Sequence, residues 1–162
     1  AWYGPATITG TFGTAILSRR PLRATRVAFT YSDTDEIGTA GAEIDVGGRT
    51  FTVYNVHPDG SDEAMLSFAR TLVGRAGGRE GVIVLGDFNI REDDAAWPIL
   101  EAAFTEAWTA AYPSRVGPDG TDMRRRIDRV MVSRDLGVRD PVYVQAPRSA
   151  TDHPVHWADV TW

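Results

Sequence analysis

Residues 81–86 read Gly-Val-Ile-Val-Leu-Gly, and this short, wholly apolar run constrains the fold more than any other part of the sequence. A run of β-branched residues without polar positions is typical of a strand that is buried on both faces. Such a strand lies inside a sheet that further layers cover. The chain has 162 residues, which is about the length of one domain. We therefore expect a single domain over residues 1–162 with a layered α/β fold.

The rest of the sequence alternates between strand and helix patterns. Two alternating runs around residues 47–48 (Gly-Gly) predict a β-hairpin, because two glycines favour a tight turn. Residues 61–63 (Ser-Asp-Glu) are typical of a helix start, and a second helix is expected from residue 93 to about residue 104. Further strands are predicted at residues 12–18, 25–30, 42–46, 50–57, 127–133, 138–145 and 155–162. This order predicts a layered β-sandwich with a mixed sheet and flanking helices.

The composition excludes several classes of protein and of site. All 17 basic residues are arginine and 22 residues are acidic, so the net charge is −5. Proteins that bind long nucleic acid are usually basic, which makes such a partner less expected here. The sequence contains no cysteine, which excludes disulfides, thiolate zinc sites and cysteine nucleophiles. No run approaches the roughly 20 apolar residues of a transmembrane helix, so no transmembrane segment is expected.

Polar residues follow the apolar run directly. Asp87 and Asn89 come after Gly86, and residues two positions apart in an extended chain point to the same side. A carboxylate and an amide in this arrangement suit a divalent metal ion or a phosphate group. Gly, Asp and Asn are also the usual turn residues, so a simple turn is the alternative interpretation.

Two histidines and two further aspartates are also candidate residues. His57 ends a predicted strand, and His153 follows Asp152 in a loop before the last strand. Each histidine alone is more often a surface residue or an ordinary hydrogen-bonding group. Asp128 stands within an apolar strand, where an unpaired charge is costly, so it needs a partner. That partner is either an arginine of residues 124–126 or a histidine that Asp128 orients.

Four segments, taken in order, carry a resemblance to a known family. They are residues 54–57 (Tyr-Asn-Val-His), 82–89 (Val-Ile-Val-Leu-Gly-Asp-Phe-Asn), 126–128 (Arg-Ile-Asp) and 151–153 (Thr-Asp-His). With these motifs the sequence resembles the endonuclease/exonuclease/phosphatase superfamily, whose fold is that of deoxyribonuclease I. Residues 12–22 also resemble a strand that many members, including bacterial sphingomyelinases, carry upstream of the site.

The resemblance implies a phosphodiesterase or phosphomonoesterase that depends on Mg²⁺ or Mn²⁺. In such enzymes a histidine activates a water molecule for in-line attack on phosphorus. Here His153 would be that base, with Asp128 behind its far ring nitrogen. The implied catalytic residues are His153, Asp128, His57, Asp87 and Asn89. The implied metal ligands are Asp152, Asp87 and Asn89, and the implied phosphate contacts are His57, Asn89 and Arg126.

The family pattern also includes elements that this sequence does not show. It begins with a strand that carries an asparagine and a second strand that ends in Gln-Glu, where the glutamate is the principal metal ligand. Both would precede Ala1. We therefore expect the C-terminal part of the domain, without the first strands and helix of the fold. Strand edges left open in this way favour a homodimer or pairing with the missing N-terminal segment.

Three hypotheses about the function remain open. The negative net charge and the short arginine cluster at residues 124–126, which suits a single phosphate group, favour a lipid-linked or small phosphodiester. A DNA or RNA endonuclease of the same superfamily is the first alternative. The second alternative is a non-catalytic fragment whose metal site is incomplete.

Overall fold

A computed structural model describes residues 14–30, 38–118, 120, 122, 124–144, 147 and 151–162. This part of the chain contains eight strands and three helices. The strands are β1 (Leu22–Phe29), β2 (Thr39–Val46), β3 (Arg49–Val56), β4 (Val82–Asp87), β5 (Phe104–Glu106), β6 (Asp128–Ser133), β7 (Gly137–Val144) and β8 (Val155–Thr161). The helices are α1 (Asp62–Ala76), α2 (Trp97–Ala103) and α3 (Ala107–Ala111).

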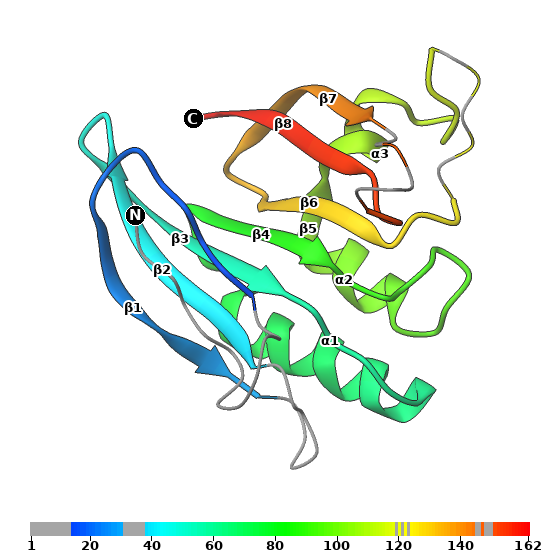
Figure 1. Cartoon of the computed structure of the whole chain (residues 1–162), viewed down its shortest axis with the longest axis horizontal. Coiled ribbons are helices and arrows are strands. Elements are labelled where there is room, and N and C mark those ends of the chain that lie inside the picture. Colours follow the sequence, from blue (N-terminus) through cyan, green and yellow to red (C-terminus); the bar gives the residue numbers. More distant parts are fainter. Residues whose placement is uncertain are drawn as a thin grey trace.

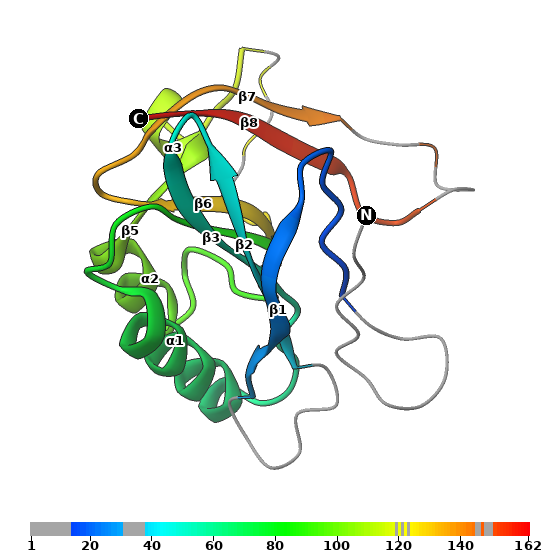
Figure 2. The same cartoon turned by 90° about the vertical axis from the view of Figure 1, so that its left-hand side faces the viewer.

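The strands form two sheets in separate layers. The larger sheet has six strands in the order β1-β2-β3-β4-β6-β5, and the smaller sheet pairs β7 with β8. The larger sheet is mixed, because β3 and β4 run parallel while its other pairs are antiparallel. Figure 1 shows α1 and α2 on one face of the larger sheet and the β7–β8 sheet on the other, and Figure 2 shows these layers from the side. The predicted α/β class with flanking helices is confirmed.

Two apolar clusters fill the spaces between the layers. The larger cluster lies between the larger sheet and the helices α1 and α2, and includes the fully buried Phe68 and Val84. The smaller cluster lies on the opposite face, where Phe51 and Val132 meet apolar residues of β7 and β8. Val84 of β4 belongs to the first cluster and its neighbour Ile83 packs against the second. β4 is therefore covered on both faces, as its apolar sequence predicts, and each fully buried aliphatic side chain contributes roughly 1.5–3 kcal/mol.

The predicted Gly-Gly turn and the predicted start of the first helix are also confirmed. Gly47 and Gly48 join β2 to β3 with φ angles of 59° and 81°, and a tight turn between antiparallel strands requires positive φ at both positions. Ser61 precedes α1, and its side chain accepts a hydrogen bond from the backbone N of Ala64. This bond satisfies one of the N–H groups that a helix start leaves without a partner.

The segment before β1 differs from the prediction. Residues 14–18, expected as part of a strand, have no regular secondary structure, and residues 12 and 13 lie outside the described residues. Ile16 nevertheless packs against Ala40 and Ala42 of β2. Ile16 is therefore buried without a ladder of strand hydrogen bonds, while its neighbours Ala15 and Leu17 are exposed.

The helices after β4 differ in length from the prediction. α2 begins at Trp97, later than residue 93, because the Asp94 carboxylate accepts a hydrogen bond from the backbone N of Arg91 and closes a turn before the helix. The short elements β5 and α3 were not predicted, since three and five residues are too few to show a period. Among the helices described, none combines the length and apolar character needed to cross a membrane.

Candidate active site

Three strand ends meet at one edge of the larger sheet. β3 and β4 are parallel, and Val56 at the end of β3 lies opposite Gly86. β6 is antiparallel to β4, so its first residue, Asp128, pairs with Asp87 at the end of β4. His57 follows Val56 directly. The sheet therefore brings His57, Asp87 and Asp128 to one edge, although they are far apart in the sequence.

Gly86 lets β3 and β4 approach closely at this edge. Its φ angle is +135°, and a Cβ atom at this position would lie 2.1 Å from the carbonyl oxygen of Val56 and 2.8 Å from the side-chain oxygen of Asn55. Only glycine, which has no Cβ, can occupy such a place. The close approach leaves Nε2 of His57 3.7 Å from Oδ2 of Asp87.

Asp87 and Asp128 form a pair of carboxylates on one face of the sheet. Residues directly opposite each other on antiparallel strands point to the same face, with Cβ atoms about 5 Å apart, and like charges there repel. Burial raises the pKa of Asp87 above its usual range, and the nearby charge of Asp128 raises it further, against a hydrogen bond from the backbone N of Asn89. A cation between the two carboxylates would relieve this repulsion.

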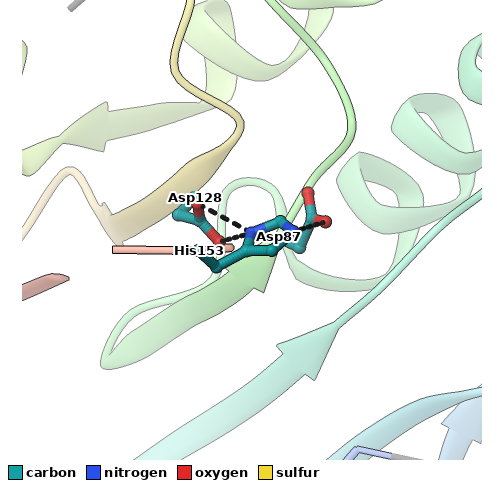
Figure 3. A group of neighbouring side chains, drawn as sticks. All are labelled: Asp87, Asp128 and His153. Carbon is teal, nitrogen blue, oxygen red and sulfur yellow. Dashed lines mark hydrogen bonds and ion pairs between the residues drawn. The ribbon is translucent and has the colours of Figure 1, made fainter. Parts of the chain in front are cut away.

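His153 lies between these two carboxylates (Figure 3). Its Nδ1 atom is 3.0 Å from one oxygen of Asp128 and 3.1 Å from the other, and its Nε2 atom is 3.8 Å from Oδ2 of Asp87. The backbone N of His153 donates to the Thr151 hydroxyl and fixes the loop before β8. The hydrogen bond to Asp128 raises the pKa of His153, and the charges of Asp87 and Asp152 add to this effect. Of the two partners considered for Asp128, the structure thus shows the histidine.

Asn89 holds the loop after β4 against the loop after β3. Its φ angle is +50°, in the left-handed region that asparagine tolerates better than most residues. Its backbone N donates to Oδ1 of Asp87 at 2.8 Å, and its side-chain amide donates to the carbonyl of Pro58 at 2.9 Å. The turn that the sequence allows is therefore present, and its hydrogen bond keeps Asn89 next to Asp87.

Three residues of this edge have the geometry of a metal site. Asp87, Asp128 and His153 each offer one ligand atom, and these atoms lie within 4.8 Å of one another. Asp152 is exposed next to His153 and acts on it through its charge. Carboxylate oxygens are the ligands that Mg²⁺ and Mn²⁺ prefer. Asp87 and Asp128 supply such oxygens, so these two carboxylates fit the expected type of ion.

Arg126 is buried, unlike the other predicted site residues. Its side chain is 4% exposed, and its Nη2 atom donates to Oε1 of Glu106 at 3.1 Å. The guanidinium is stacked between the rings of Trp108 and Tyr143, at 4.9 and 4.5 Å from their centres. Burial lowers the pKa of Arg126 to about 10. The expected contact with a substrate phosphate does not agree with this position, because the guanidinium is engaged by Glu106 beneath the surface.

Arg129 is a buried residue of this region to which the sequence motifs gave no role. Its side chain is 1% exposed and pairs with Glu92. The available signal was a charged residue at an inward position of an apolar strand, directly after Asp128. Such a residue must have a buried partner, but the sequence alone does not say which one.

Comparison with known proteins gives one family and a set of similar folds. The model of the Endonuclease/Exonuclease/phosphatase family matches residues 2–153. Comparison with curated proteins finds no match. An endonuclease/exonuclease/phosphatase from Beutenbergia cavernae superposes with a TM-score of 0.65 at 18% identity, over 98% of this chain and 52% of its own chain.

Two further solved structures are similar in fold. The human Nocturnin catalytic domain, solved with a bound sulfate anion, has a TM-score of 0.60 at 18% identity, over 90% of this chain and 62% of its own. A mannosyl-6-phosphatase from Bacteroides thetaiotaomicron has a TM-score of 0.56 at 15% identity, over 76% of this chain and 57% of its own. The chain thus spans between about half and three fifths of the length of these structures.

Proposed function

Because the chain belongs to the endonuclease/exonuclease/phosphatase family, whose members are hydrolases acting on phosphate esters, we propose that it hydrolyses a phosphate ester with a divalent metal ion and with His153 as the general base. The observation that carries this proposal is the pairing of His153 with Asp128. A carboxylate only accepts hydrogen bonds, so Nδ1 of a neutral His153 carries the ring proton. Nε2 is then the nitrogen free to take a proton from water, and it faces Asp87.

The residues around His153 support this role. As the water attacks, the ring becomes a cation, and the Asp128 carboxylate stabilises that cation and keeps the ring oriented. His153 is 41% exposed at its side chain, so a water molecule and a substrate can reach it. An unperturbed histidine titrates near pH 6.5, which suits base catalysis around neutral pH.

The proposed metal ligands are Asp87, Asn89 and Asp152, with Asp87 as the central one. Asp128 and His153 also lie near Asp87, but they are assigned to proton transfer. Its carboxylate lies at the edge where two negative charges oppose each other, and this is the kind of site that a divalent cation stabilises. A bound Mg²⁺ or Mn²⁺ would supply charge neutralisation of the phosphate oxygens. His57 and Asn89 are the proposed phosphate contacts, because both lie next to Asp87.

A lipid-linked or small phosphodiester is the proposed substrate class. The loops next to Asn89 line a pocket of about 390 Å³ whose polar residues are mainly acidic. They are Asp59, Asp62, Asp93, Asp94 and Asn89. Of the arginines just before Asp128, Arg126 is bound by Glu106 and Arg124 by Asp122. With a net charge of −5, these surroundings oppose the binding of a long polyanionic backbone more than that of a substrate with one phosphate group.

A substrate panel tests this proposal. The protein is assayed with Mg²⁺ or Mn²⁺ on bis-p-nitrophenyl phosphate, p-nitrophenyl phosphate, phospholipid vesicles and supercoiled plasmid. We expect hydrolysis of the diester or the phospholipid, its loss with EDTA, and its loss in His153→Ala. Asp159→Ala, an exposed change on β8, is the control and should leave the rate unchanged.

Two results would count against the proposal. A substantial rate in His153→Ala would remove the proposed base, and the absence of any metal-dependent hydrolysis would remove the enzyme itself. Nicking of the plasmid at low salt, with little turnover of the small esters, would replace the proposed substrate class by a nucleic acid.

A further inference from the structure

Arg129 follows Asp128 in β6 and is held on three sides. Its Nη2 atom donates to the backbone carbonyl of Arg126 at 2.7 Å, and its Nη1 atom donates to Oε1 of Glu92 at 3.4 Å. Its guanidinium stacks over the ring of Trp97 at 4.3 Å. Burying a charge is unfavourable unless such partners compensate it, and a well-packed apolar side chain is often at least as stabilising. The arrangement therefore calls for an explanation other than stability.

The contacts of Arg129 fix the backbone that leads into Asp128. The backbone carbonyl of Arg126 accepts a hydrogen bond from the Arg129 side chain, so this bond joins residues on either side of Asp128 in the sequence. The next carbonyl, that of Ile127, accepts a hydrogen bond from the backbone N of Phe88 at 2.8 Å. Both peptide carbonyls before Asp128 are therefore held. One is bound by Arg129 and the other by the residue that follows Asp87.

We propose that Arg129 is a positioning residue, which keeps the Asp128 carboxylate against Nδ1 of His153 by holding the turn before β6. The proposal rests on the proposed function, in which His153 is the base. Successive residues of a strand point to opposite faces, so Asp128 points to His153 while Arg129 points to Trp97 of α2. Arg129 acts from behind the strand without touching the site.

The shape of the guanidinium is essential to this role. Arg129 lies between two glutamates, because its Nη1 atom is 3.4 Å from Glu92 and 4.0 Å from Glu106. Each glutamate also binds a second arginine, Arg115 for Glu92 and Arg126 for Glu106. A planar fork can serve a carbonyl and a carboxylate at once, whereas a lysine ammonium is a point charge on a flexible stem. A lysine at position 129 would therefore restore the charge without restoring the whole set of bonds.

The test compares Arg129→Met and Arg129→Lys with the original protein. The first readout is the tautomer of the neutral His153 ring, measured by long-range ¹⁵N–¹H NMR, which requires no activity. We expect Nδ1–H in the original protein and a rise of the Nε2–H form to at least half in Arg129→Met. The second readout is kinetic: kcat falls roughly 10- to 100-fold, as for a misplaced catalytic group, while KM changes little. Arg129→Lys should recover part of both.

Arg49→Met is the matched control. It also removes a guanidinium from an ion pair, with Asp135, but this pair lies near the start of β4, at the opposite end from Asp87. We expect it to leave the tautomer and kcat unchanged. An unchanged tautomer in folded Arg129→Met, or an equal change in Arg49→Met, would overturn the proposal.

A second variant covers the case in which Arg129→Met does not fold. Glu92→Gln keeps the size of the side chain and removes the charge that binds Nη1 of Arg129. We expect the same shift of the His153 tautomer, smaller in size, and an unchanged tautomer in this variant also overturns the proposal. If the original protein hydrolyses no phosphate ester, the proposed function fails, while the tautomer measurement still decides whether Arg129 positions Asp128.

Discussion

The imidazole of His153 is hydrogen-bonded through Nδ1 to both carboxylate oxygens of Asp128, at 3.0 and 3.1 Å. The two residues belong to different elements, since Asp128 begins β6 and His153 precedes β8. The contact therefore depends on how the β7–β8 sheet packs on the larger one. It engages the Nδ1 atom of the ring, while Nε2 faces Asp87.

Replacing Asp128 by asparagine tests the orienting role. Asp128→Asn keeps the shape of the side chain but removes the charge that favours the Nδ1–H form and the ring cation. We expect kcat to fall roughly 10²- to 10⁴-fold, less than in His153→Ala, because a base is still present. Steady-state kinetics on the diester substrate measure both, with Asp159→Asn on β8 as the control. An equal or greater loss in Asp128→Asn would mean that Asp128 has another role.

The rate should depend on pH through His153. The hydrogen bond to Asp128 raises the pKa of His153 above the usual value of about 6.5. A general base acts only when it is unprotonated, so kcat/KM should rise with pH through this raised pKa and then level off. In Asp128→Asn the midpoint should move to lower pH. An NMR titration of the ring gives the pKa independently, and a midpoint at or below 6.5 in the original protein would contradict the assignment.

The pair of His153 and Asp128 should stabilise the folded protein more at low pH than at high pH, whereas the rate should rise with pH. A pKa that is higher in the folded than in the unfolded protein means that folding favours the protonated ring. The contribution of the pair to stability is complete below the unfolded pKa and is lost as the pH rises through the folded pKa. Urea unfolding on both sides of this window should show a decrease toward high pH that is absent in Asp128→Asn.

Metal binding should depend on Asp87. Asp87→Asn removes the charge of the proposed central ligand and also relieves the repulsion with Asp128. We expect the affinity for Mn²⁺ or Mg²⁺, measured by titration calorimetry, to fall at least about 10-fold, the size of effect seen when ligand shells are altered. Asp159→Asn should bind the ion as the original protein does. An unchanged affinity in Asp87→Asn would exclude Asp87 as the central ligand.

The close approach of β3 and β4 at Gly86 should make the free energy of unfolding sensitive to substitution there. Gly86→Ala places a Cβ atom 2.1 Å from the Val56 carbonyl oxygen, at a φ angle that alanine rarely adopts. We expect the free energy of unfolding to fall by about 2–5 kcal/mol. Gly48→Ala is the control, since Gly48 also has positive φ but open space around it, and should lose about 1 kcal/mol. Equal losses in urea unfolding would show that the contact with β3 is unimportant.

Much of the architecture follows from patterns in the sequence. The apolar run that becomes β4, the glycine pair between β2 and β3, and the Ser61 cap of α1 each give a local signal of known physical origin. The structure brings His57 and Asp87 together because β3 and β4, which lead to them, are parallel neighbours, but no local pattern predicted that these strands pair. The proximity of Asp128 to His153 came from the family resemblance, since no local pattern joins residues so far apart.

The partners of the buried arginines could not be predicted from sequence patterns. Residues 124–126 read as an exposed cluster beside the site, yet Arg126 is buried against Glu106, whose own strand, β5, was not predicted. The partner of a buried charge depends on tertiary packing, which overrides the usual preference of arginine for the surface. Tertiary packing also explains the irregular course of residues 14–18, because Ile16 is buried against β2 without pairing as a strand.

The pairing of Asp87 with Asp128 across β4 and β6 sets the spacing of the two carboxylates by strand register. A slip of one residue would turn one of them to the opposite face, so the spacing is either kept or lost, with no intermediate. Loops that border the edge, such as residues 58–61 and 91–96, are not part of this ladder. Changes in these loops that keep the bonds made by Pro58 and Glu92 would therefore alter the surroundings of the two carboxylates while their spacing stays the same.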